Sequence, residues 1–191
     1  MAAVAVDQRG RILDAALRLM AEQGSVGASM RQLAAACELN VATLYHYFPS
    51  KADLLESVVR ERQYGERLAI DAPPLDLAIA PRARLVALLD WLWANALEEQ
   101  AVWRLIVGEA VRGEAAATRA AAEVVDLLGA TLESWFESGF SDVDGDRAAM
   151  ARVVRGQVFA LVVEHLAVGA VTTDAAHERA QELASVLLPS G

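Results

Sequence analysis

The sequence predicts an all-α fold with an amino-terminal three-helix helix-turn-helix domain and a larger carboxy-terminal helical domain. Apolar residues recur at helical spacing nearly everywhere, and no stretch shows convincing strand alternation. The 191 residues are 55% hydrophobic with only 5 prolines, which is typical of a helical globular protein. The segment "DAPPLD" at 71–76 divides the chain, because Pro73 and Pro74 cannot sit inside a helix.

Local signals place the first three helices. A helix over about 8–23 is closed by Gly24 as a carboxy-terminal cap. Ser29 and Gln32 have the spacing of a capping box, which starts a second helix over Met30–Ala36. After the turn "CELN", Asn40 is a good amino-terminal cap for a short third helix over Val41–Tyr47, which Pro49 ends.

A fourth helix, over 51–70, connects a helix-turn-helix domain at 1–51 to a second domain at 75–191. In the second domain, Pro81 suits the first turn of a helix. Two long helices follow, over about 115–138 and 145–169, and Asp174 is expected to cap a final helix that runs to about Leu188.

The stretch "NVATLYHYFPSK" at 40–51 carries the clearest functional signal. If Leu44 and Phe48 anchor the short third helix to its neighbours, its other side chains cannot all face the core. Hydroxyl and imidazole groups on a helix surface can donate to phosphate oxygens, and Lys51, the only lysine in the chain, adds a charge. Ser29 and Arg31, at the start of the second helix, can also face phosphate. The alternative is that the tyrosines are ordinary core residues whose hydroxyl groups reach solvent.

Charge is unevenly distributed along the chain. The formal net charge is −9, although nucleic-acid binders are usually basic. Residues 1–51 contain five basic and four acidic groups, so the acidity lies outside the predicted helix-turn-helix domain.

Residues 9–59 resemble the amino-terminal domain of the TetR family of bacterial transcriptional regulators. The resemblance rests on "RILDAALRLMAEQG", "SMRQLAAACELN" and "VATLYHYFPSKADLL", which contain the specific pattern "LY-x-x-F-x-S-K-x-x-L". It implies a second domain that binds a ligand and forms a homodimer. It also implies which residues contact DNA. Base edges would lie nearest Val41, Ala42 and His46, and phosphates would be held by Thr43, Tyr45, Tyr47 and Lys51. Arg31 would reach either a base or a phosphate.

The turn of the motif departs from the family pattern, which usually has glycine where this chain has Glu38. If residue 38 must adopt a positive φ, glutamate is strained there by about 1 kcal/mol. The alternative is that the turn follows a different path.

The two long helices are apolar around most of their circumference, which indicates burial on several sides. One face in the chain's own core and another against a partner would satisfy this pattern, and a monomer core is the alternative. We expect the dimer interface at Trp135, Val154, Val158, Leu161 and Val162.

The second domain also concentrates aromatic residues among a few polar groups, as ligand pockets do. An apolar small-molecule effector is therefore expected near Trp91, Trp93, Asn95, Trp103, Arg104, Phe136 and His165. The same aromatics could instead simply fill the core.

No catalytic constellation, metal-ligand spacing or cofactor motif is recognisable, so the sequence does not predict an enzyme. The start, "MAAVAVDQRG", lacks a basic segment and a long apolar stretch, and no run of residues could span a bilayer; a cytosolic protein is expected. The sequence predicts a homodimeric repressor that binds a palindromic operator and is released by an effector. The alternatives are a regulator controlled by a protein partner, and a carrier or enzyme with an incidental helix-turn-helix.

Overall fold

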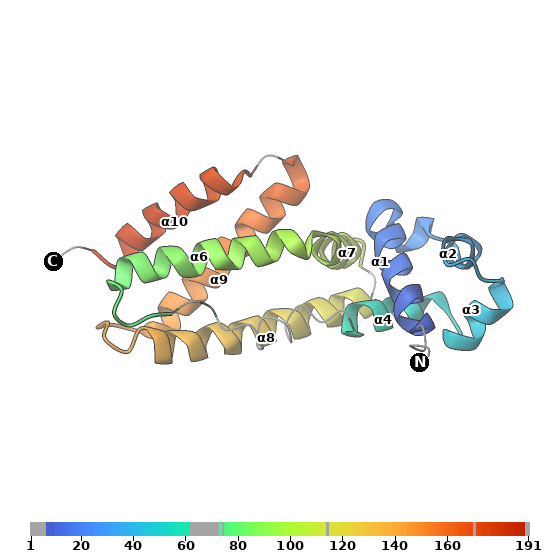
Figure 1. Ribbon diagram of the computed structural model, residues 1–191, viewed down its shortest axis with the longest axis horizontal. Coiled ribbons are helices and arrows are strands. Elements are labelled where there is room, and N and C mark those ends of the chain that lie inside the picture. Colours follow the sequence, from blue (N-terminus) through green and yellow to red (C-terminus); the bar gives the residue numbers. More distant parts are fainter. Residues whose placement is uncertain (1–6, 62–72, 74, 114, 170, 190–191) are drawn as a thin grey trace, which may run out of the picture. The chain divides into compact units, whose positions relative to one another are not determined.

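The computed structural model describes residues 7–61, 73, 75–113, 115–169 and 171–189. These residues form nine helices and no strand, which confirms the predicted all-α class (Figure 1). The helices group into two compact units. One contains Met1–Gln63 and Ala101–Glu123, and the other contains Tyr64–Gln100 and Val124–Gly191. Residues 101–123 therefore cluster with the amino-terminal unit, although they follow the "DAPPLD" segment in the sequence.

The amino-terminal unit begins with four helices: α1 (Gln8–Gly27), α2 (Met30–Ala36), α3 (Val41–Tyr47) and α4 (Lys51–Glu61). Both predicted caps of the short helices are confirmed. Ser29 and Gln32 form the complete capping box of α2, and the Asn40 Oδ1 atom accepts a hydrogen bond from the Thr43 backbone N–H over 2.7 Å. Residues 62–70 of the predicted fourth helix lie outside the described residues.

The core of this unit explains how a helix as short as α3 is held. Leu44 is 0% exposed and Phe48 is 2% exposed, as the sequence predicted. Helix α3 packs against α2, and the same unit also buries these apolar residues of α1, α2 and α4: Ile12, Ala16, Met20, Leu33, Leu54, Leu55 and Val58. Because two turns of helix are unstable alone, burial of Leu44 and Phe48 fixes α3 and sets which of its side chains face outward.

Helix α1 is not continuous to its end. Gly24 adopts φ 75° and ψ 159°, values outside the helical region, and kinks the chain before the last turn of α1. A positive φ is accessible to glycine at little cost. The predicted end of the first helix at Gly24 corresponds to this kink, and residues 25–28 then lead directly into the cap of α2.

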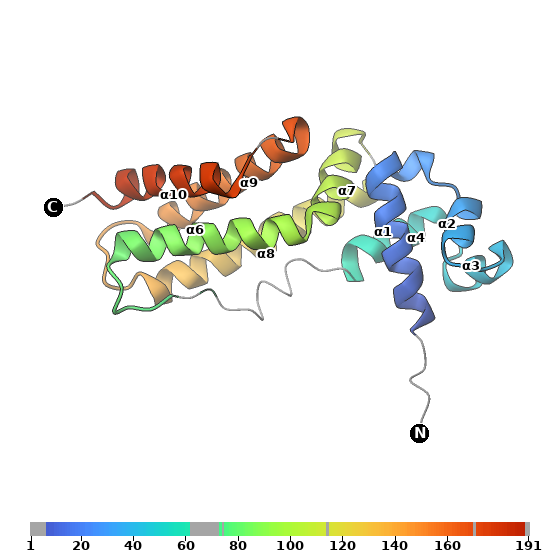
Figure 2. The ribbon, with the colours of Figure 1, turned by 45° about the horizontal axis from the view of Figure 1, so that its top comes forward.

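The second unit is built around α6 (Pro81–Glu98), α9 (Arg147–Val168) and α10 (Thr173–Leu187), with most of α8 (Ala115–Gly139). Helix α7 (Gln100–Val111) starts in this unit and continues in the other. Helix α10 lies along α6 (Figures 1 and 2). The buried residues of α10 are small, namely Ala176, Ala180 and Ala184, which allows close helix packing.

The helix ends of the second unit agree with the sequence except at one cap. Pro81 occupies the first turn of α6, and α9 ends at Gly169, which has the left-handed φ of 67°. The expectation that Asp174 caps the last helix is wrong. The hydroxyl of Thr172 caps α10 by accepting from the Ala175 N–H over 3.2 Å, and Asp174 lies in the first turn, where its charge complements the helix dipole.

Candidate nucleic-acid interface

The turn between α2 and α3 ends α2 with a Schellman motif. The backbone N–H of Leu39 donates to the Ala34 carbonyl over 2.9 Å, and the N–H of Glu38 donates to the Ala35 carbonyl over 3.1 Å. This motif needs a left-handed residue after the cap, and Glu38 supplies it with a φ of 58°. The positive φ that the sequence raised as a condition is therefore present, at a position where glycine would be unstrained.

Helix α3 presents most of its predicted contact residues outward. Ala42, Tyr45, His46 and Tyr47 are exposed, with Tyr45 at 47% and Tyr47 at 38%, while Val41 and Thr43 are partly exposed. The tyrosines are thus not core residues of the described chain. One outward group is already engaged, since the Thr43 hydroxyl donates to Asn40 Oδ1 over 2.9 Å.

The start of α2 and the start of α4 flank this helix in the sequence. The Ser29 hydroxyl is engaged in its capping box, because it accepts from the Gln32 N–H and donates to Gln32 Oε1 over 2.6 Å. Arg31 is exposed. The Lys51 Nζ atom lies 3.3 Å from the Val26 carbonyl, to which it donates, and an ammonium group has two further donors.

The predicted ligand residues divide between the two units. Trp91, Trp93, Asn95, Phe136 and His165 belong to the second unit, whereas Trp103 and Arg104 belong to the first. Trp93 is buried and meets the His165 ring edge-on at 5.5 Å, and Trp91 meets Trp135 at 5.5 Å.

Two polar groups of the predicted ligand set have other partners. The Asn95 amide donates to the Trp91 carbonyl of its own helix over 2.8 Å. His165 Nδ1 lies 3.2 Å from the Val171 carbonyl, and its Nε2 lies 3.0 Å from the Gln100 amide nitrogen. This network assigns the proton of a neutral imidazole to Nδ1. Sequence reasoning missed Gln100, which is 65 residues from His165 and carries no local signal.

The predicted interface residues differ in exposure. Val154, Leu161 and Val162 are buried within the chain itself, while Val158 and Trp135 are half-buried. The large apolar residues that α9 leaves exposed are Val153 and Phe159, each 45% exposed, and Val168 at its end. The exposed Gly156 and Ala160 lie on the same face as Val153 and Phe159 by helical spacing.

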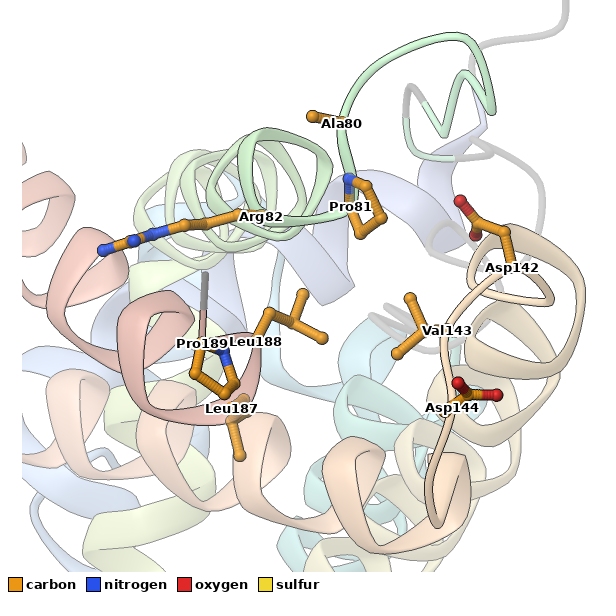
Figure 3. A pocket seen from close by; sticks show the side chains of 9 residues that line it. All are labelled: Ala80, Pro81, Arg82, Asp142, Val143, Asp144, Leu187, Leu188 and Pro189. Atoms are coloured by element: carbon orange, nitrogen blue, oxygen red, sulfur yellow. The ribbon is translucent and has the colours of Figure 1, made fainter. Parts of the chain in front are cut away.

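A surface cavity of about 360 Å³ lies at the start of α6 (Figure 3). Its walls come from the start of α6, the turn before α9 and the end of α10: Ala80, Pro81, Arg82, Asp142, Val143, Asp144, Leu187, Leu188 and Pro189. None of the predicted ligand residues lines it. Next to it, the buried Arg84 donates from Nη2 to both carboxylate oxygens of Asp142, over 2.7 and 2.9 Å.

Over the part of the chain that the structure describes, no group of three or more His, Cys, Asp or Glu side chains is placed to hold a metal ion. No described helix is long and apolar enough to cross a membrane.

Comparison with known proteins agrees with this architecture. Residues 12–58, which include α2, α3 and most of α4, match the family model of bacterial regulatory proteins of the tetR family. The HTH-type transcriptional repressor KstR of Mycolicibacterium smegmatis is 34% identical over 157 residues, which is 78% of this chain and 71% of that protein. KstR of Rhodococcus jostii is 29% identical over 188 residues, which is 97% of this chain and 84% of that protein.

A solved structure shows the same fold over nearly the whole length. The crystal structure of a TetR-family transcriptional regulator from Mesorhizobium loti matches with a TM-score of 0.77 and 21% sequence identity. The match covers 98% of each chain. The helical second unit is therefore part of the shared architecture, as well as the helix-turn-helix.

Proposed function

Because this chain belongs to the TetR family of bacterial transcriptional regulators, whose helix-turn-helix binds DNA, we propose that it is a homodimeric repressor released from its operator by a small-molecule effector. The observation that carries the DNA-binding part is the outward face of α3. Burial of Leu44 and Phe48 turns Tyr45, His46 and Tyr47 to the surface, next to a capped turn.

We assign the DNA contacts by position in the motif. Val41 and Ala42 face base edges in the major groove, where amino-terminal residues of a recognition helix usually lie. His46, in the last turn of α3, is assigned to a base edge by its place in the family motif. Thr43, Tyr45, Tyr47 and Lys51 bind phosphates. Arg31, exposed at the start of α2, reaches a base or a phosphate, and Ser29 chiefly caps α2 through its bonds to Gln32. The phosphate contacts give affinity and register, and the base contacts give sequence preference.

A homodimer accounts for tight specific binding by so short a helix. Two copies on a two-fold axis read a palindromic operator whose half-sites lie about 34 Å, or a multiple of it, apart. We place the partner against one exposed face of α9, made by Val153, Gly156, Phe159 and Ala160. The buried Val154, Leu161 and Val162 support this face from within the chain.

The effector is proposed to be a mostly apolar molecule that binds in the second unit near Trp93, Phe136 and His165. Support comes from the aromatic concentration and from the polar pair of His165 and Gln100, which could fix the orientation of a ligand. The effector can release DNA only if it binds more tightly to a dimer whose two helix-turn-helix domains do not match the operator spacing than to the DNA-binding form of the dimer.

Selection from a random double-stranded DNA library tests the function directly. The protein should enrich one palindromic sequence and bind it at least a thousandfold more tightly than unrelated DNA. A thermal-shift screen of apolar compounds then searches for the effector. A compound that raises the melting temperature should weaken operator binding, because the coupling between two sites is reciprocal. Failure to enrich any sequence would contradict the proposal.

A further inference from the structure

A buried carboxylate joins α7 to the end of α1. Val102, Leu105 and Ile106 are buried on one stripe of α7, and Glu109 continues that stripe while being only 1% exposed. An apolar residue there would avoid the cost of removing a charge from water. The carboxylate is therefore expected to have a specific partner, and it has two.

Both carboxylate oxygens of Glu109 are satisfied. Oε1 accepts from the Ser25 backbone N–H over 2.8 Å and from Arg112 Nη1 over 2.7 Å, and Oε2 accepts from the Ser25 hydroxyl over 2.5 Å. Ser25 lies 84 residues away in the sequence. Ser25 and Glu109 belong to the same unit although the "DAPPLD" segment lies between them in the sequence, and these hydrogen bonds connect them.

The segment that Glu109 holds leads directly to the predicted DNA contacts. Ser25 follows the kink at Gly24, where an added Cβ would also lie 3.3 Å from the Arg112 guanidinium. Four residues later Ser29 caps α2, the helix that carries Arg31. Lys51 holds the same segment, because its ammonium donates to the Val26 carbonyl.

We propose that Glu109 is a positioning residue for DNA binding, which fixes the start of α2 through its bonds to Ser25. This inference rests on the proposed function. The side chain touches no DNA itself; it acts by holding the segment at 24–28, from which α2 begins.

The ionisation of Glu109 supports this role. Burial raises the pKa of the carboxyl group, but the two hydrogen bonds from Ser25 and the positive charge of Arg112 more than compensate and hold the pKa below its usual value. The group is therefore a carboxylate at neutral pH, and its bonds to Ser25 and Arg112 are charge-assisted.

The test compares operator affinity across matched variants, by fluorescence anisotropy with the library-selected operator and well below each melting temperature. Glu109→Ala and Ser25→Ala should each raise the operator Kd about tenfold, within the usual range of coupling between sites. The double variant should bind no more weakly than the weaker single variant, because both changes break one contact. Glu109→Gln should bind within about threefold of wild type, because its amide oxygen can accept from the Ser25 N–H and its NH2 group can donate to the Ser25 hydroxyl, whereas Ser25→Ala loses the hydroxyl bond.

Val102→Ala is the matched control, since it weakens the packing of the same stripe without touching the contact. It should lower the melting temperature and leave the operator Kd at the wild-type value. If Glu109→Ala does not fold, Ser25→Ala and Glu109→Gln decide the question. Wild-type operator affinity in folded Glu109→Ala, independent effects in the double variant, or an equal loss in Val102→Ala would each overturn the inference. A wild-type protein that enriches no DNA would overturn the proposed function, and this inference with it.

Discussion

Glu38 stores strain at the turn that joins the two helices of the motif. Its φ of 58° is uncommon for a residue with a long side chain, while the Schellman bonds of Leu39 and Glu38 hold the turn in place. The left-handed conformation costs about 1–2 kcal/mol for such a residue. The motif forms in spite of this cost because its caps and its buried leucines specify the same turn.

Replacing Glu38 by glycine is expected to stabilise the protein. Relief of the strain outweighs the added flexibility of the unfolded chain, and the net gain should be about 0.5–1 kcal/mol. Urea unfolding measures the change. Glu38→Gln is the control, because it removes the charge and keeps the strained backbone, so its stability should stay near that of wild type. Equal stabilities of the glycine and glutamine variants would contradict the explanation.

The pKa of Glu109 predicts a pH-dependent contribution to stability. Because the pKa is lowered in the folded state, the contribution is complete above the ordinary glutamate pKa of about 4.3 and is lost as the pH falls through the lower folded-state value. At pH 7, Glu109→Gln should be less stable than wild type by about 1–3 kcal/mol.

Urea unfolding of both proteins from pH 7 down to pH 3 checks this prediction. The difference in unfolding free energy should shrink toward acid. The pKa values of Asp142 and Glu164 are also lowered, chiefly by hydrogen bonds from Arg84 and Arg179, but these groups are common to both proteins and cancel in the difference. A difference that does not change with pH would show that the charge of Glu109 has no part in it.

Among the helices, the short ones were the most predictable. The limits of α2 and α3 were predicted correctly because their caps, Ser29 with Gln32 and Asn40 with Thr43, are local in sequence. The sequence did not predict in the same way which side of α9 faces the core. A helix that is apolar around most of its circumference does not reveal from its sequence that Val154 turns inward while Val153 turns outward.

Contacts between distant segments also escaped prediction. Ser25 with Glu109, and Gln100 with His165, are pairs of ordinary residues more than sixty positions apart. No spacing rule connects such residues, and only the packing of α7 brings them together. The candidate DNA contacts could be predicted from the sequence because they lie within one contiguous motif. The residues of a ligand pocket come from several helices, so no single motif in the sequence identifies them.

The two faces of α3 should separate stability from DNA binding. Leu44→Ala should cost about 2–5 kcal/mol of unfolding free energy, because it leaves a cavity in a fully buried site. Tyr45→Ala, on the exposed face, should change stability by less than about 0.5 kcal/mol and yet weaken operator binding. Chemical denaturation and anisotropy measure the two effects. A stable Tyr45→Ala variant with full operator affinity would remove this residue from the DNA contacts.

For the whole molecule, the dimer proposal predicts an effect at the exposed face of α9. Phe159→Glu should yield a folded monomer, because an unpaired charge in the interface costs several kcal/mol. Sedimentation velocity measures the change, and circular dichroism checks the fold. Val186→Glu, which places the same charge at an exposed apolar residue of α10, should remain a dimer. A dimeric Phe159→Glu variant would place the interface elsewhere.

The charge distribution of the whole chain makes salt dependence the sharpest test of DNA binding. With a net charge of −9, the protein can hold DNA only through a local set of donors, which we place at α2, α3 and the start of α4. The decisive measurement is the operator Kd of wild type and of the Tyr47→Ala/Lys51→Ala double variant between about 50 and 200 mM salt. Over this range, the slope of log Kd against log salt concentration reports how many phosphates the protein neutralises. The double variant should fold normally and bind all sequences more weakly, and its salt slope should be shallower by about one unit, for the lost lysine contact. A folded double variant with wild-type affinity and slope would contradict the assignment of the DNA-binding surface.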